Sequence, residues 1–119
     1  MLEMYTHSDL VYIIDVNGKV LETLRSKHFS GLRLIGAFPD QFLRNRDLKI
    51  ALQYIVEAIK YGVQNTITIK TWSLSGIRIK EKRNFTFKRW GNGRAVVFSS
   101  LLAKETAESK KKWQLVKTI

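Results

Sequence analysis

The stretch SDLVYIIDVNGKVLETL, residues 8–24, decides the fold class of this chain. Strand-forming residues 10–15 lead into Asn17-Gly18, and residues 19–24 form a second strand-like run. Asn-Gly tolerates positive φ at both positions of a tight turn, which makes it the strongest short hairpin signal. The first run is too apolar to alternate, as in a strand that is buried on both faces. The stretch therefore predicts an antiparallel hairpin whose first strand is central in its sheet.

The next part of the chain has the spacing of helices. Residues 26–47 contain two glycines and the single proline, Pro39, and predict short helical turns that wrap on a core. Residues 48–61 predict one long helix, because apolar residues recur there with a period of 3.6. This stripe consists of Leu48, Leu52, Ile55 and Ile59. Gly62 follows where a C-terminal cap glycine is expected.

Beyond Gly62 the apolar residues recur at every second position. Ile67 and Ile69 alternate with polar residues, and two further strand-like runs cover residues 77–88 and 94–100. The turn signals Ser75-Gly76 and Gly91-Asn92-Gly93 separate the three runs. This pattern predicts a meander of three strands.

The order of elements predicts an α+β fold. It is a five-stranded antiparallel sheet with helices between strands 2 and 3 that cover one face. This domain is expected to span residues 1–102. Residues 103–119 lack glycine and proline and predict a C-terminal helix.

Composition limits the function classes. A chain of 119 residues with 45% apolar residues is most simply one domain with a sizeable core. The absence of cysteine excludes disulfides, a cysteine nucleophile and thiolate metal sites. No apolar run approaches the roughly 18 residues of a membrane span, and the first ten residues do not resemble a signal peptide. We therefore expect a cytoplasmic location.

The residues argue against an enzyme. The stretch His7-Ser8-Asp9 contains the residue types of a catalytic triad, but adjacent positions cannot form one unaided. Residues 91–93 join two strands rather than a strand and a helix, so they do not form a phosphate loop. Acidic residues and histidines do not occur at metal-ligand spacing.

Four segments, in order, resemble a PAS domain over residues 8–102. They are SDLVYIIDVNGKVLE (8–22), FSGLRLIGAFPDQFL (29–43), ALQYIVEAIKYG (51–62) and GNGRAVVFSS (91–100). The resemblance implies a sensory or regulatory module, and PAS domains hold haem, flavin, small metabolites or nothing. The chain departs from the family where LLAKETAES replaces the usual Asp-Ile-Thr that ends the last strand.

The cofactor implied by the resemblance stays unknown. Haem would need an axial histidine, commonly on the long helix, and residues 48–61 contain none; His7 and His28 lie elsewhere. Flavin photochemistry would need a cysteine. Non-covalent flavin, with Trp72 as a stacking residue, remains open, although a tryptophan in the core is the simpler interpretation.

Inward-facing apolar residues predict a pocket for a small apolar or aromatic ligand. The expected lining residues are Tyr12, Ile14, Leu34, Ile35, Ile55, Ile59, Phe87 and Phe98, with Trp72 as noted. The alternative is that these side chains fill the core themselves.

The C-terminal helix is expected to carry the signal and to join two chains in a homodimer. The expected contact residues are Leu101, Leu102, Trp113, Leu115 and Val116. In a longer protein, the effector that receives the signal would be a kinase, a cyclase or a DNA-binding module. A domain that binds only protein partners, without a small ligand, is a further alternative.

The net charge of +11 offers another interpretation. A surplus of this size attracts polyanions, although a merely solvated basic surface accounts for it as well. The candidate residues for nucleic-acid binding are Arg78, Lys80, Lys82, Lys88 and Trp90. The order of strands and helices differs from that of the RNA-recognition motif.

Overall fold

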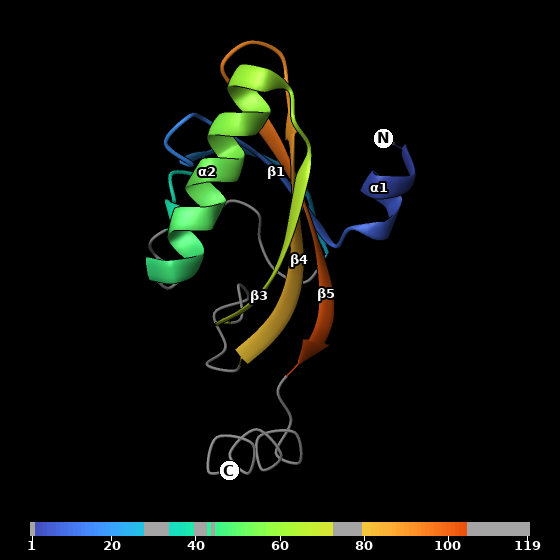
Figure 1. Cartoon of the computed structure of the whole chain (residues 1–119). Coiled ribbons are helices and arrows are strands. Elements are labelled where there is room, and N and C mark those ends of the chain that lie inside the picture. The colour runs from blue at the N-terminus through green and yellow to red at the C-terminus, as the bar shows by residue number, and fades with distance from the viewer. Residues whose placement is uncertain (1, 28–33, 40–42, 44, 73–79, 105–119) are drawn as a thin grey trace.

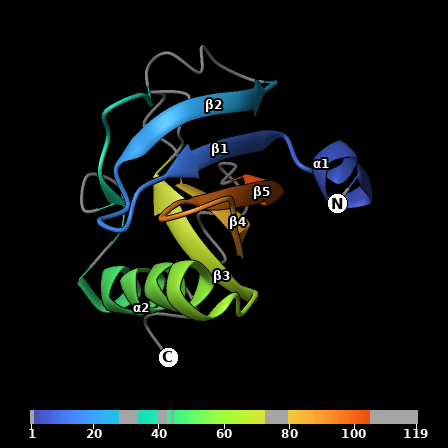
Figure 2. The ribbon, with the colours of Figure 1, turned by 90° about the horizontal axis from the view of Figure 1, so that it is seen from above.

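A five-stranded antiparallel sheet forms the centre of the chain in its computed structural model, which describes residues 2–27, 34–39, 43, 45–72 and 80–104. The elements are α1 (Leu2–His7), β1 (Leu10–Ile14), β2 (Val20–Ser26), α2 (Asn45–Tyr61), β3 (Asn65–Trp72), β4 (Lys80–Arg89) and β5 (Ala95–Lys104). The strand order is β2-β1-β5-β4-β3, and every neighbouring pair is antiparallel. Figure 2 shows this order from above. The predicted α+β class and the five strands are confirmed.

Helices α1 and α2 lie on opposite sides of the sheet (Figure 1). We call the face covered by α2 the inner face and the opposite one, against which α1 packs, the outer face. The inner core joins alternate residues of β1, β3, β4 and β5 to α2: Leu10, Tyr12, Ile14, Ile69, Phe85, Phe87, Ala95, Val97, Ala51, Ile55 and Ala58. The outer core is smaller, and in it Val11, Val96 and Phe98 contact Met4 and Tyr5 of α1.

The hairpin between β1 and β2 forms as the sequence predicts, although of the two turn residues Asn17 and Gly18 only Gly18 has positive φ. The Asp15 carboxylate accepts hydrogen bonds from the backbone N–H groups of Asn17 (2.9 Å) and Lys19 (3.0 Å). Gly18 has φ of 83°, and a Cβ atom there would lie 2.6 Å from Cγ of Pro39. The turn therefore needs glycine twice, for its backbone angle and for its close contact with Pro39. Because β2 has only β1 as a neighbour, it is an edge strand.

Helix α2 begins at Asn45, three residues before the predicted start, and ends at Tyr61 as predicted. Gly62 follows with φ of 67°. Arg89 of β4 donates hydrogen bonds to the carbonyl oxygens of Ile59 and Lys60 (3.2 and 2.9 Å). Carbonyl groups in the last turn of α2 thus find their hydrogen-bond donor in the sheet on which the helix packs.

The end of the sheet corrects one part of the prediction. β5 continues to Lys104, so Leu101 and Leu102 belong to a strand and not to the C-terminal helix. The reason is pairing, because β4 starts at Lys80 and offers hydrogen-bond partners as far as Lys104. Leu102 is the extra residue of a β-bulge and is exposed. The predicted helix contacts Trp113, Leu115 and Val116 lie outside the described residues.

Helix α1 has no counterpart in the sequence prediction. Its six residues are too few to display a helical period. Tyr5 donates a hydrogen bond to the carbonyl oxygen of Leu24 on β2, and Ser8 donates one to that of Met4. Contacts with the outer face therefore hold this short helix in place.

Candidate ligand-binding site and buried ionic network

A small cavity lies between the inner face of the sheet and α2. Its volume is about 20 Å³, which is room for roughly one water molecule. The walls come from β1, β3, β4, α2, the hairpin turn and the segment before α2: Tyr12, Ile14, Gly18, Pro39, Leu43, Ala51, Ile55, Ile67, Ile69, Phe85 and Phe87. In this conformation the side chains themselves fill most of the inner site.

Four of the predicted pocket residues line this cavity together. They are Tyr12, Ile14, Ile55 and Phe87. Leu34 is buried in the same core, and Ile59 packs at its margin, but neither contributes to the cavity wall. The predicted region is therefore assembled by β1, α2 and β4, as the alternation along the strands indicates.

Two predicted pocket residues lie elsewhere, and the prediction for them is wrong. Ile35 is 47% exposed in the turn after Leu34. Phe98 packs on the outer face with Val11 and Val96. Four consecutive apolar residues, 95–98, conceal the alternation of β5, so the sequence alone does not say which pair points inward. The side chain of Trp72 is outside the described part of the structure.

Sequence reasoning missed several wall residues of the cavity. Ile67, Ile69 and Phe85 share the inner positions of β3 and β4, and their period of two was a sufficient signal. Gly18 and Pro39 were not recognisable in this way, because their contact joins two distant turns.

Pro39 also forms part of a groove on the surface. This groove has a volume of about 420 Å³ and is lined by Asn17, Phe38, Pro39, Leu48 and Leu52. The inner cavity and the groove thus share Pro39. In the hairpin turn, Gly18 borders the cavity and Asn17 borders the groove. A single layer of residues separates the buried site from the surface.

Tyr12 carries the only polar side chain among the cavity wall residues of the described chain. Burial raises the pKa of its hydroxyl well above the usual value, and the nearby positive charge of Arg83 opposes this rise only in part. The phenol therefore stays protonated at neutral pH. It gives the inner site one group that can form hydrogen bonds.

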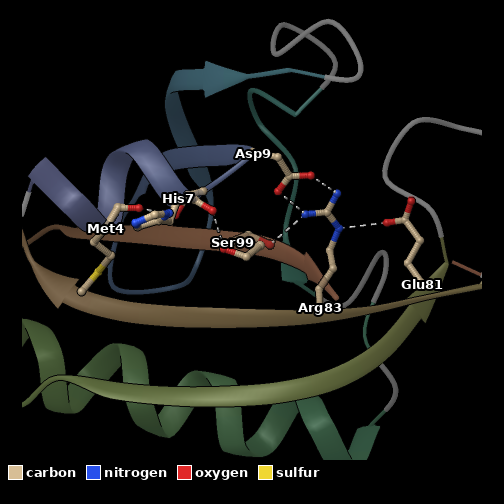
Figure 3. A network of polar contacts seen from close by, with 8 residues as sticks. Met4, His7, Asp9, Glu81, Arg83 and Ser99 are labelled. Atoms are coloured by element: carbon tan, nitrogen blue, oxygen red, sulfur yellow. Dashed lines mark hydrogen bonds and ion pairs between the residues drawn. The ribbon is translucent and has the colours of Figure 1, made fainter. Parts of the chain in front are cut away.

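A network of buried charges lies on the inner face beyond the cavity (Figure 3). The guanidinium of Arg83 donates two hydrogen bonds to the Asp9 carboxylate (2.8 and 2.9 Å) and one to Glu81 (2.9 Å). It donates a fourth to the hydroxyl of Ser99 (3.1 Å). The side chains of Arg83 and Glu81 are each only 2% exposed. The forked geometry suits arginine, which presents several donors in one plane.

The electrostatics of this network keep Arg83 charged. Burial lowers the pKa of its guanidinium, but the hydrogen bonds and charges of Asp9 and Glu81 outweigh burial and raise that pKa above the usual value. Asp9 precedes β1, Glu81 and Arg83 lie on β4, and Ser99 lies on β5. The network therefore joins three separate parts of the sheet at the end where β1 begins.

The sequence contains a signal for this network that the prediction did not use. Inward positions of β4 are apolar at Phe85 and Phe87, but the two preceding inward positions are Glu81 and Arg83. Opposite charges two residues apart on a core face are expected to pair, because an isolated buried charge is costly. The partner Asp9, 74 residues away in sequence, was not predictable from spacing.

Among the described residues, no group of three or more His, Cys, Asp or Glu side chains could hold a metal ion. Asp9 and Glu81 bind Arg83, and His7 lies exposed at the end of α1. His28 falls outside the described residues.

The predicted polyanion-binding residues lie partly together. Lys80, Lys82 and Lys88 occupy alternate positions of β4 that face away from α2. Trp90 follows the strand and is 37% exposed. Arg78 lies outside the described residues.

Comparisons with solved structures identify the fold. The PAS-B domain of Drosophila melanogaster Cycle with bound ethylene glycol is similar with a TM-score of 0.56 and 11% sequence identity, over 78% of this chain and 99% of that one. A tryptophan-to-alanine variant of that domain with bound glycerol gives 0.57 and 10%, with the same coverage. The PAS domain of an HTR-like protein from Haloarcula marismortui gives 0.55 and 11%, over 85% and 89%. The chain therefore has the PAS fold.

No protein-family model matches the chain, and no curated protein sequence is significantly similar to it. The helices within the described residues are all too short or too polar to cross a membrane.

Proposed function

We propose that this chain is a PAS-type regulatory module whose inner site takes a small apolar or aromatic ligand. The observation that carries the proposal is the inner cavity of this PAS fold. The described residues of its walls are apolar except for the hydroxyl of Tyr12. Apolar walls with one polar group suit a ligand that has a ring or short chain and one hydrogen-bonding atom. We propose a regulatory role and not a catalytic one.

The cavity of about 20 Å³ is too small for such a ligand, so binding requires a second conformation. The contact between Gly18 and Pro39 is the place where the site would open, because Pro39 also borders the surface groove of about 420 Å³. Movement of Pro39 would join the two spaces. A ligand that binds only the open state shifts the equilibrium toward it, and this shift is the proposed signal.

The signal would leave through β5. Ala95 and Val97 of this strand pack in the inner core, and the strand continues to Lys104. A change in the inner core therefore reaches the residues that precede the predicted C-terminal helix. We further propose that this helix joins two chains through Trp113, Leu115 and Val116, with Leu101 and Leu102 at its approach.

Native mass spectrometry of the freshly purified chain is the first test, followed by denaturation of the same sample. The proposal expects a mass excess that disappears on denaturation. The size of that excess would give the mass of the ligand.

Methyl NMR with indole as the probe gives a second test on the ligand-free chain. Indole is expected to shift the isoleucine methyl signals of the inner site, from Ile14, Ile55 and Ile69. Ile13 and Ile35 are matched controls, because Ile13 alternates to the outer face and Ile35 is exposed. If no mass excess is found and indole shifts neither group, the ligand-binding function is wrong.

The homodimer is tested by the molar mass in solution, from light scattering during gel filtration. A dimer that becomes a monomer on Trp113→Ala would support the helix contact. A monomeric parent chain would refute it.

A further inference from the structure

One end of the fold carries exposed apolar side chains on two neighbouring connections. At this end α2 leads into β3, and β4 turns into β5 (Figure 1). Tyr61 of the first connection is 72% exposed, and Val63 beside it and Trp90 of the second connection are exposed as well. Exposed apolar side chains that gather at one place mark contact sites on proteins. We call residues 60–64 and 88–94 the aromatic end.

Contacts between the two connections hold the aromatic end together. Arg89 donates hydrogen bonds to two carbonyl oxygens in the last turn of α2 (3.2 and 2.9 Å). A Cβ atom at Gly62 would lie 3.5 Å from the guanidinium of Arg89. In the register of β3 and β4, Asn65 lies opposite Phe87, so the residues before Asn65 run beside those after Phe87. The two connections are therefore neighbours in space.

The aromatic end also carries a surplus of positive charge. Its basic residues are Lys60, Lys88, Arg89 and Arg94. Three of them are exposed and one is half-buried. Residues 82–104 contain no acidic residue, and Glu57 is the only one in residues 48–80. Its carboxylate accepts hydrogen bonds from Gln53 (3.2 Å) and Asn65 (2.7 Å). The aromatic end is therefore suited to an anionic partner.

The turn between β1 and β2 lies at the same end of the sheet, because Ile14 pairs with Ala95 at the start of β5. This turn adds Val16, which is also an exposed apolar residue. Asp15 and Lys19 of the turn add one charge of each sign. Three turns from separate parts of the sequence thus bring exposed apolar side chains to one end of the fold.

We propose that the aromatic end binds the surface of an anionic lipid membrane. Tryptophan and tyrosine favour the boundary between lipid and water, because each combines an apolar ring with one hydrogen-bonding group. Lysine and arginine beside them are attracted to anionic headgroups. A Cβ atom at Gly91 or Gly93 would meet no other atom within 4 Å, so the turn that follows Trp90 projects into open space. This inference goes beyond the proposed ligand site and rests on other residues.

Other partners fit the aromatic end less well. A stable protein interface takes roughly 20 to 30 residues from each side, and the aromatic end supplies about half of that number. Single-stranded nucleic acid binds in grooves where successive bases stack on aromatic rings, and an aliphatic side chain such as Val63 gives no such support. A second copy of the chain would bring like charges together. A membrane surface needs neither a groove nor a wide complementary surface.

Docking at the aromatic end leaves the other end of β5 free. The strand begins at Ala95, beside the aromatic end, and continues to Lys104. Nine residue steps along a strand correspond to about 30 Å. The residues after Lys104 would therefore point away from the membrane, toward partners in solution.

Co-sedimentation with lipid vesicles tests the role of the charges. The vesicles contain phosphatidylcholine with about 30% phosphatidylserine, or phosphatidylcholine alone. The parent chain should bind only the vesicles that contain phosphatidylserine. The test variant combines Lys60→Gln, Lys88→Gln and Arg94→Gln. The matched control combines Lys27→Gln, Lys49→Gln and Lys82→Gln, which remove the same charge from exposed positions elsewhere. Each basic residue at a membrane surface contributes about fivefold, so the test variant should lose at least about tenfold in affinity and the control about twofold or less.

Fluorescence quenching by lipids with brominated acyl chains tests the insertion of the rings. Trp90→Phe keeps an apolar ring but removes the fluorophore, so most of the quenching seen with the parent chain should disappear while the vesicles still bind. The double variant Tyr61→Ala and Trp90→Ala should weaken binding by roughly tenfold or more. The matched control combines Ile35→Ala and Leu102→Ala, at exposed apolar positions elsewhere, and should change binding by about twofold or less.

The proposal is overturned if the parent chain does not bind vesicles with phosphatidylserine, or if Trp90→Phe leaves the quenching unchanged. Equal weakening by the two triple variants would also overturn it, since the effect would then be one of diffuse net charge. A labelled oligonucleotide or polyglutamate that binds more tightly through the same residues would make nucleic acid or an acidic protein the partner instead. Far-UV circular dichroism and thermal unfolding confirm that each variant folds.

Discussion

The two faces of β4 use charge in opposite ways. Inward, Glu81 and Arg83 are buried and bind each other, with Asp9 and Ser99 completing the hydrogen bonds. Outward, the lysines of the same strand share one sign, and Lys82 among them is exposed. The inner charges help to fix the fold, because each depends on its partner, whereas the exposed charge of Lys82 lies at the surface. A single strand thus separates buried, paired charges from charges on the outer face by alternation alone.

The largest difference in stability between variants of the two faces should appear when each face loses one charge. Arg83→Met leaves the buried Glu81 and the partly buried Asp9 without the charge of Arg83 and is expected to cost about 3 to 5 kcal/mol of unfolding free energy. Lys82→Met, one residue away on the outer face, should change it by less than about 0.5 kcal/mol. Urea unfolding of both variants measures the difference. Equal effects would refute the distinction between the faces.

Removal of the whole inner network sharpens this prediction. The triple variant Asp9→Asn, Glu81→Gln and Arg83→Met carries no buried charge in the network. It should recover at least half of the stability that Arg83→Met alone loses, because unpaired charges cost more than neutral groups. A triple variant that is less stable than Arg83→Met would show that the loss comes from packing.

Loss of side-chain volume should destabilise the fold on the inner face but not at exposed positions. Ile55→Ala removes three carbon atoms beside a cavity that already exists and is expected to cost about 2 to 5 kcal/mol. Val63→Ala, at an exposed position after α2, should cost less than about 0.5 kcal/mol. Chemical denaturation gives both values. If Ile55→Ala costs under about 1 kcal/mol, the inner core is able to collapse around the change.

Two glycines with similar φ angles allow the cost of backbone strain to be measured apart from the cost of a steric collision. Gly18 has φ of 83° and Gly36 has φ of 87°, but an added Cβ atom would meet other atoms only at Gly18. Gly36→Ala should cost about 1 kcal/mol from the backbone angle. Gly18→Ala should cost about 2 to 4 kcal/mol, because its Cβ would also collide with Pro39. The difference in stability between the two variants, from thermal unfolding, measures the cost of the collision with Pro39. Equal losses of stability would mean that Pro39 moves aside at little cost.

The smallest expected effect is the loss of folding stability at alkaline pH that the Tyr12 hydroxyl causes. Burial raises its pKa above the unfolded value of about 10, so the folded chain keeps this proton when the unfolded chain has lost it. The stabilising contribution is complete below about pH 10 and falls by roughly 1.4 kcal/mol per pH unit above it. Tyr12→Phe should lose this part of the dependence. Urea unfolding at several pH values from about 9 to 11 compares the two chains, and parallel curves would contradict the prediction.

The sequence was a good guide where one physical signal dominated. Asn17-Gly18 predicted the hairpin, and the period of α2 predicted a helix that ends at Tyr61 as observed. Four of the predicted pocket residues line one cavity for the same kind of reason, since alternation places Tyr12, Ile14 and Phe87 on the inner face and the helical period places Ile55 against it. In each case the signal is local, so it does not depend on the rest of the fold.

The failures have a common cause, which is dependence on distant residues. Phe98 lies in a run without alternation, and only its pairing with Val11 places it on the outer face. Leu101 and Leu102 extend a strand because β4 offers partners, although the residues after them favour a helix. Asp9 reaches Arg83 across 74 residues. Pairing partners of this kind are set by the assembled sheet and not by composition or period.

The position of β5 beside β1 has a mechanical consequence. The strands are antiparallel, with Leu10 opposite Ser99 and Ile14 opposite Ala95, so the chain enters β1 and leaves β5 at the same end of the pair. A force applied between these two ends would load the hydrogen bonds one after another, as in a zipper, rather than all at once in shear. The first contacts under load would include those of Asp9 with Arg83. The domain should therefore open at low force from the end that holds the buried charges.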